Sequence, residues 1–149
     1  MGRILFFTEG TSYRIEGKGV LRQWMSKTVK KEGFTLGDLN IILCDDNFLL
    51  KLNKKYLKKK TLTDIITFPD DGSGKIAGGE IYISIDRIKE NAKQYGIRIS
   101  DELSRIIIHG ILHLAGYKDG TEDEKRTMRE REEKYLKTLR KGKESVILS

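Results

Sequence analysis

The sequence has one cysteine, one proline and two histidines among its 149 residues. Since Cys44 has no second cysteine to pair with, an intrachain disulfide is excluded, and its place in an apolar run predicts a small buried side chain. The single proline, together with the absence of a Ser/Gly-rich linker, an internal repeat or a low-complexity tract, favours one domain. We place this domain at residues 1–140 and expect residues 141–149 to form a flexible basic tail.

Long hydrophobic runs are also missing. The N-terminal segment Met1–Phe7 contains the charged Arg3, so it has neither the apolar region of a signal peptide nor a membrane-spanning helix. We therefore expect a soluble cytoplasmic protein that does not use a membrane. The 29 Lys and Arg residues exceed the 22 Asp and Glu residues, and the formal net charge of +7 favours a polyanionic partner such as nucleic acid over a membrane surface.

The spacing of apolar residues predicts an α+β fold, with a small mixed four-stranded sheet packed with about five helices. The expected strands cover residues 4–7, 38–44, 64–68 and 80–85. Ser100 or Asp101 is expected to cap the helix that holds both histidines. Thr121 and Glu124 have the spacing of a capping box, which predicts the start of the last helix.

The two histidines lie four positions apart, at His109 and His113. On a helix this spacing places both side chains on one face, where two imidazoles can contact a single cation. Gly116 is placed to end the helix, and Asp119 beyond the turn becomes the candidate third ligand. The alternative is a pair of hydrogen-bonded core histidines, because Ile106–Leu114 is apolar on most sides. A shared metal ion is favoured, since it gives two buried imidazoles one common partner.

The spacing His-x3-His-x2-Gly-x2-Asp matches the ligand arrangement of metzincin-like zinc proteases. Those proteases carry a Glu general base directly after the first His, whereas this chain has Gly110, which can transfer no proton. Three protein ligands leave a fourth tetrahedral position for water, as in catalytic zinc sites, while a structural site would favour cysteines. An open zinc site in a basic protein therefore predicts phosphodiester hydrolysis by metal-bound water, with no protein base assigned.

The segment from His109 to Asp119, together with Leu52-Asn53, Thr63–Pro69 and Gly79–Ser84, closely resembles the bacterial YbeY endoribonucleases. The pattern His-Gly-x-Leu-His-Leu-x-Gly-Tyr is its most specific part, and the motifs agree in order and spacing along most of the chain. The resemblance implies an α+β fold, a zinc cofactor and cleavage of single-stranded ribosomal RNA. It further implies a role in 16S rRNA 3′-end maturation and ribosome quality control, with the ribosome or small-subunit proteins as partners.

Two positions depart from the pattern of this family. Asp119 stands where the family usually has a third histidine. A carboxylate also binds zinc, but two histidines and one carboxylate suit Fe(II) or another divalent metal as well. Leu57 stands where the family commonly has an arginine that is thought to help with the phosphate. Phosphate contacts are therefore expected from other residues.

The nearest candidates for these phosphate contacts are five lysines that precede the Thr63-Asp64 motif: Lys54, Lys55, Lys58, Lys59 and Lys60. Such a run is either a solvated surface or a source of non-specific, salt-dependent contacts with RNA. Thr63 and Asp64 are candidates to orient the substrate or to hydrogen-bond to a metal ligand, and the alternative is a local turn hydrogen bond. The nearly balanced charges of residues 121–140 predict an exposed, self-paired helix surface with no role in RNA binding.

We predict a metal-dependent endoribonuclease with His109, His113 and Asp119 as ligands, in which either water or the neighbouring 2′-hydroxyl is the nucleophile. The alternative is a non-catalytic RNA- or ribosome-binding assembly factor that keeps the metal for folding, which the loss of the usual arginine motivates. An Fe(II) oxygenase fits the ligand types, but such sites usually draw their ligands from separate strands of a barrel.

Overall fold

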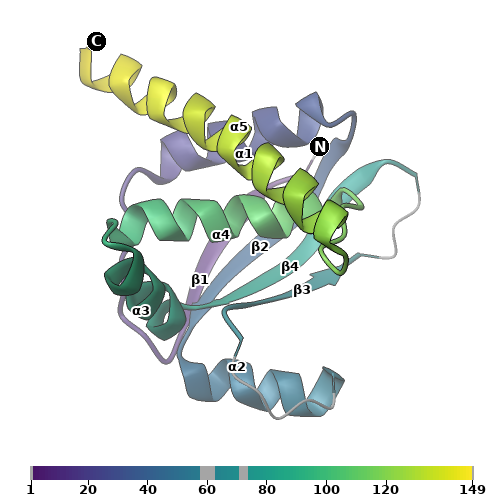
Figure 1. Cartoon of the computed structure of the whole chain (residues 1–149), viewed down its shortest axis with the longest axis vertical. Coiled ribbons are helices and arrows are strands. Elements are labelled where there is room, and N and C mark those ends of the chain that lie inside the picture. Colours follow the sequence, from purple (N-terminus) through teal and green to yellow (C-terminus); the bar gives the residue numbers. More distant parts are fainter. Residues whose placement is uncertain (1, 58–62, 71–73, 149) are drawn as a thin grey trace.

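One mixed sheet organises the fold. The computed structural model describes residues 2–57, 63–70 and 74–148, and within these ranges four strands occur in the order β1-β2-β4-β3. The strands β1 (Ile4–Glu9), β2 (Thr35–Cys44) and β4 (Ile76–Ser84) are parallel, and β3 (Ile65–Pro69) pairs with β4 in the antiparallel direction. The expected α+β fold with a small mixed sheet is confirmed (Figure 1).

β2 and β4 begin earlier than apolar spacing predicts, at Thr35 and Ile76. The first residues of β4 are rich in glycine, and such a composition is typical of a loop. Gly79 has a φ of 134°, and a Cβ at this position would overlap the carbonyl oxygen of Phe68 in β3. Only glycine therefore lets the two strands pair this closely, and packing overrides the poor strand propensity of the segment.

Within the same described ranges five α-helices occur, as expected: α1 (Lys18–Lys31), α2 (Asp46–Leu52), α3 (Ile85–Tyr95), α4 (Ile99–Leu114) and α5 (Glu122–Leu148). A π-helical segment, η1 (Asn53–Leu57), directly continues α2. The capping box at the start of α5 is confirmed, because the Glu124 N–H donates to Thr121 Oγ1 at 3.1 Å and the Thr121 N–H donates to Glu124 Oε1 at 2.9 Å.

The expected cap of α4 at Ser100 or Asp101 is wrong. The helix begins at Ile99 after Arg98, which has an extended backbone, and no side chain caps this end. The N–H groups of Asp101 and Glu102 both donate to the Arg98 carbonyl at 3.1 Å, so the chain enters the helix before the polar residues. Asp101 and Glu102 instead lie in the first turn, where their negative charges interact favourably with the helix dipole.

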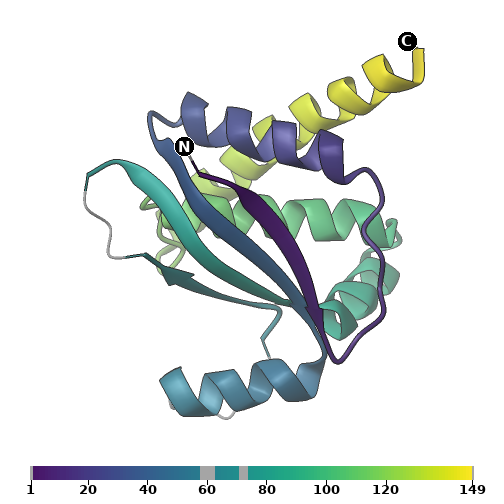
Figure 2. The ribbon, with the colours of Figure 1, turned by 180° about the vertical axis from the view of Figure 1, so that it is seen from behind.

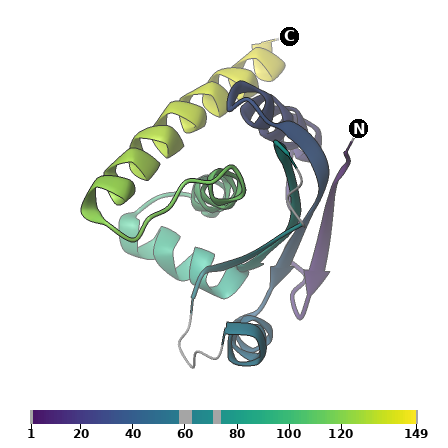
Figure 3. The same cartoon turned by 90° about the vertical axis from the view of Figure 1, so that its right-hand side faces the viewer.

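The helix α4 lies between the sheet and α5 (Figure 3). Its residues Ile107, Ile108 and Leu112 are fully buried in the main core. Gly110 faces the sheet, and a Cβ there would lie 3.0 Å from the Cδ1 atoms of both Ile65 and Ile81. The glycine therefore sets how closely α4 approaches the sheet. The opposite face of the sheet is not covered by α4 or α5 (Figure 2).

The last helix, α5, continues through residues 141–148, so the backbone is helical within the segment expected to be a flexible tail. The division of the chain at residue 140 stays a prediction. Along the described residues, none of the helices combines the length and the apolar character needed to cross a membrane. Cys44 is fully buried, as expected, and burial together with nearby carboxylates raises the pKa of its thiol to about 12.

Candidate metal centre

Three side chains at the end of α4 point their ligand atoms at one another. His113 Nε2 lies 3.0 Å from His109 Nε2, and Asp119 Oδ2 lies 3.3 Å from His109 Nε2 and 3.4 Å from His113 Nε2. A tetrahedral zinc ion with bonds of about 2.0–2.1 Å holds its ligand atoms about 3.3–3.5 Å apart. Both distances to Asp119 match this spacing, and the separation of the two nitrogens is slightly shorter. Among the described residues, these three form the group that could hold an ion.

The turn after α4 brings Asp119 back to the histidines. Gly116 has a φ of 98°, which is favourable for glycine. The Gly116 N–H donates to the His113 carbonyl at 3.0 Å, and the Tyr117 N–H donates to the Leu112 carbonyl at 3.0 Å. These bonds satisfy carbonyls at the end of the helix and reverse the chain direction, as the sequence predicts from Gly116.

Each imidazole is oriented by a hydrogen-bond acceptor on its other nitrogen. His109 Nδ1 lies 2.6 Å from Glu132 Oε2, and His113 Nδ1 lies 3.0 Å from the Tyr117 carbonyl oxygen. Because an ionised carboxylate and a carbonyl can only accept, each Nδ1 carries the proton and each Nε2 keeps a lone pair. Two lone pairs and a carboxylate oxygen then face one point, which is the donor set of a divalent cation.

The electrostatic environment of the histidines also favours a cation. Burial lowers the pKa of His109, but the hydrogen bond and charge of Glu132, with further contributions from Asp119 and Asp64, raise it above its ordinary value overall. The negative charge that favours a protonated imidazole also favours a bound metal ion at the same point. The side chains of His109 and His113 are 17% and 26% exposed, so the centre remains open to solvent.

Glu132 is a site residue that the sequence interpretation missed. The charges of α5 predict an exposed surface, but Glu132 is only 3% exposed and its carboxylate contacts His109. A count of charges does not show the helical spacing of buried residues. Glu132 lies four residues after the buried Met128 and three before the buried Tyr135, on the same face of α5. A charged residue on the apolar stripe of a helix was the signal that could have identified it.

Glu132→Gln is expected to lower zinc affinity about 10- to 100-fold, because the amide removes the charge that fixes the His109 tautomer and orientation. A competition titration against a chromophoric chelator measures this change. Glu133→Gln is the matched control, since Glu133 is the exposed neighbour on the same helix. Equal affinity of the Glu132 variant and the wild type would show that this contact does not support a metal ligand.

The other predicted site residues are not among the three candidate metal ligands, and their positions do not assign them a role. The Thr63 hydroxyl donates to the Ile65 carbonyl at 3.3 Å, which is a local hydrogen bond. Asp64 lies close enough for its charge to raise the pKa of His109. Lys54 and Lys55 are exposed in η1, whereas Lys58, Lys59 and Lys60 lie outside the described residues. The role of these lysines in RNA contacts stays a prediction.

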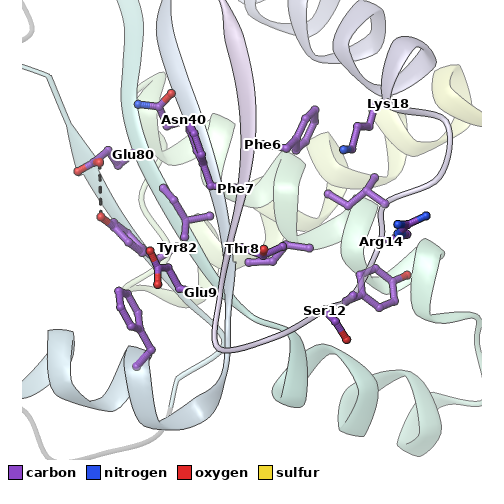
Figure 4. A pocket seen from close by; sticks show the side chains of 15 residues that line it. Phe6, Phe7, Thr8, Glu9, Ser12, Arg14, Lys18, Asn40, Glu80 and Tyr82 are labelled. Atoms are coloured by element: carbon purple, nitrogen blue, oxygen red, sulfur yellow. Dashed lines mark hydrogen bonds between the residues drawn. The ribbon is translucent and has the colours of Figure 1, made fainter.

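A separate hollow of about 770 Å³ extends from the face of the sheet opposite α4 around β1 to the segment between β1 and α1 (Figure 4). Phe7, Asn40 and Glu80 line it, and the Tyr82 hydroxyl donates to Glu80 Oε2 at 3.4 Å. Their side chains alternate with those that face α4, such as Ile81, because successive residues of a strand point to opposite faces. None of the three candidate metal ligands lines this hollow.

Comparison with known proteins identifies the family of this chain. A protein-family model described as Endoribonuclease YbeY matches residues 9–140. The chain belongs to the YbeY endoribonuclease family. The family resemblance expected from the histidine motif is thereby confirmed.

Similar members of the YbeY family cover nearly the whole chain. Endoribonuclease YbeY of Cytophaga hutchinsonii is 45% identical over 139 residues, which cover 93% of this chain and 96% of that protein. Endoribonuclease YbeY of Christiangramia forsetii is 42% identical over 135 residues, covering 91% and 93% of the two chains. A solution structure of a Thermotoga maritima protein has a TM-score of 0.61 and 29% identity, covering 97% of this chain and 93% of that one.

Proposed function

We propose that this chain is a metal-dependent endoribonuclease that cleaves single-stranded ribosomal RNA in the cytoplasm. The observation that carries the proposal is the convergence of His109 Nε2, His113 Nε2 and Asp119 Oδ2, in a chain that belongs to a family of endoribonucleases. A role in 16S rRNA 3′-end maturation and ribosome quality control, with the ribosome or small-subunit proteins as partners, is supported by the motif resemblance.

The residues of the centre have two different roles, to bind the ion and to orient the residues that bind it. His109, His113 and Asp119 would hold the ion, which supplies Lewis-acid stabilisation of a phosphoryl oxygen and activation of water. Glu132 and the Tyr117 carbonyl hold the two rings so that both Nε2 lone pairs would face an ion bound between them. Two neutral imidazoles and one carboxylate would offset only part of a divalent charge, so a site occupied by such an ion would keep a positive charge towards a phosphodiester. We propose zinc as the metal, while the same ligand set also suits Fe(II).

Contacts with the RNA phosphates must come from residues other than position 57, where the family commonly has an arginine and this chain has Leu57. Leu57 at the end of η1 is 46% exposed and carries no charge. We propose that the lysines of the same segment, beginning with the exposed Lys54 and Lys55, supply non-specific contacts to the RNA backbone. Such contacts would be weak individually and sensitive to salt.

The function is tested with purified protein and labelled single-stranded RNA. We expect cleavage by the zinc-loaded protein, loss of cleavage after chelation, and recovery when zinc is added back. A 5′-phosphate on the downstream product indicates attack by water, and a cyclic phosphate on the upstream product indicates attack by the 2′-hydroxyl.

The alternative function predicts a different result in the same assay. A folded, metal-loaded sample that binds RNA in a salt-sensitive way but does not cleave it would contradict the nuclease proposal. That outcome would favour a non-catalytic assembly factor, which the uncharged Leu57 already motivates. Circular dichroism of the sample used in the assay verifies that the protein is folded.

A further inference from the structure

A further carboxylate, largely shielded from solvent, contacts the turn that carries Asp119. Glu32, directly after α1, accepts a hydrogen bond from the Tyr117 hydroxyl at 2.6 Å through Oε1 and another from the Tyr135 hydroxyl through Oε2. The Glu32 side chain is only 8% exposed, and Arg131 Nη1 lies 3.7 Å from its Oε2. One carboxylate thus joins the end of α1, the turn after α4 and the helix α5.

The contact with Tyr117 leads directly to His113. The backbone of Tyr117 accepts a hydrogen bond from His113 Nδ1 and donates one to the Leu112 carbonyl, both at 3.0 Å. Its side chain is held at the far end by Glu32. A shift of this tyrosine would move the carbonyl that fixes the His113 ring. The hydroxyl–carboxylate bond therefore restrains the orientation of a metal ligand that Glu32 does not touch.

The contact with Tyr135 leads towards His109. Tyr135 lies three residues after Glu132 on α5, so the two side chains project from the same face of the helix. Glu132 presents its carboxylate to His109 Nδ1. Since Glu32 holds α5 at Tyr135, it also restrains the position from which Glu132 reaches His109.

The charge state of Glu32 allows it to accept both tyrosine hydrogen bonds. Burial raises the pKa of Glu32, but the two tyrosine hydroxyls and the charges of Arg131 and Lys134 lower it below its ordinary value overall. The carboxylate is therefore ionised at neutral pH and can accept from both hydroxyls at once, one at each oxygen. A glutamine of the same size has only one acceptor oxygen and cannot make the same pair of bonds.

We propose that Glu32 is a positioning residue of the metal centre, which acts through Tyr117 on His113 and through Tyr135 and α5 on Glu132 and His109. The proposal rests on the proposed metal-dependent function, because it assigns to Glu32 the alignment of the ligands that would hold the ion. It goes beyond a structural role, since a carboxylate that only joins helices would change stability without changing the affinity of the folded protein for zinc.

Zinc affinity of the folded protein is the test, measured by chelator competition on Glu32→Gln and Tyr117→Phe. Each variant is expected to bind zinc about 10-fold or more weakly, in the range found when contacts that orient a ligand are lost. Tyr117→Phe removes only the hydroxyl and keeps the ring and the carbonyl, so it should fold even where a Glu32 variant does not. Tyr95→Phe is the matched control, because this tyrosine is 61% exposed on α3.

The double variant Glu32→Gln/Tyr117→Phe separates positioning from independent effects. If Glu32 acts on His113 through Tyr117, the loss of affinity in the double variant is clearly smaller than the product of the two single losses. Unchanged zinc affinity in folded Tyr117→Phe, or fully multiplicative losses, would overturn the pathway through Tyr117.

The two proposals fail in different ways. A wild-type protein that binds zinc but cuts no RNA contradicts the nuclease function, while the affinities of the variants still decide the role of Glu32. A wild-type protein that cuts RNA but shows the same zinc affinity as the variants overturns only the positioning role. A wild-type protein that binds no divalent metal overturns both proposals.

Discussion

His113→Ala is expected to abolish metal retention. The variant loses one of three converging ligand atoms, and the remaining pair, His109 Nε2 and Asp119 Oδ2, would bind an ion much more weakly. Loss of a contact that merely orients a ligand costs about 10- to 100-fold in affinity, so loss of the ligand itself should cost more than about 100-fold. Elemental analysis after gel filtration measures the bound metal. Equal metal in wild type and variant would refute the assignment of the site.

A companion variant tests the third ligand of the same centre. Asp119→His is expected to keep or tighten metal binding, since it restores the histidine that the family usually has at this position. The side chain of Asp119 is 45% exposed, so the larger imidazole has room to adjust. Lys118→Ala serves as a control for a change in the same turn that removes no ligand. Loss of metal in Asp119→His would mean that the centre specifically requires the carboxylate.

Arg105→Met is expected to destabilise the fold by about 1–3 kcal/mol, the cost of leaving buried polar groups without a partner, since the Arg105 side chain is 32% exposed and the ion pair is only partly buried. Arg105 Nε and Nη2 donate to the two oxygens of Glu102 at 2.9 and 2.7 Å, and Nη1 donates to Glu132 at 3.4 Å. Glu102 is fully buried and Glu132 is 3% exposed. Methionine has a similar apolar stem but would leave two carboxylates without their counter-charge.

Urea denaturation of the metal-free proteins gives the change in the free energy of unfolding for Arg105→Met. Arg126→Met is the control, because Arg126 forms an ion pair with Asp123 in which the two side chains are 63% and 89% exposed. Its stability should differ from wild type by no more than about 0.5 kcal/mol. A loss below about 1 kcal/mol in Arg105→Met would show that the two carboxylates are accommodated without the guanidinium.

Local spacing was enough to predict the three candidate ligands. His109, His113 and Asp119 belong to one helix and the turn that follows it, so the periodicity of the helix and the glycine at position 116 place them together without knowledge of the rest of the fold. The mixed sheet was predictable for a similar reason, since its apolar strands are bounded by polar or glycine-rich segments. The extended starts of β2 and β4 were not, because pairing with neighbouring strands determines them.

The residues that orient the ligands could not be placed by local rules. Glu132 lies 23 positions after His109, and Glu32 lies 85 positions before Tyr117. Their contacts depend on how α1, α4 and α5 pack, which is a tertiary property. The sequence does show that both residues are acidic, but in a chain with 22 acidic residues charge alone does not identify those that contact His109 or Tyr117.

The close approach of α4 to the sheet has a consequence for the range of reactions open to this scaffold. Position 110 is where a metzincin-like protease places its general base, and here it is pressed against the ends of Ile65 and Ile81. A Cβ introduced there would lie 3.0 Å from both Cδ1 atoms, and a glutamate side chain would extend into the apolar layer between helix and sheet, where a carboxylate loses solvation. The barrier to peptidase chemistry is therefore steric and dielectric, and a single change from glycine to glutamate would not turn this nuclease scaffold into a protease.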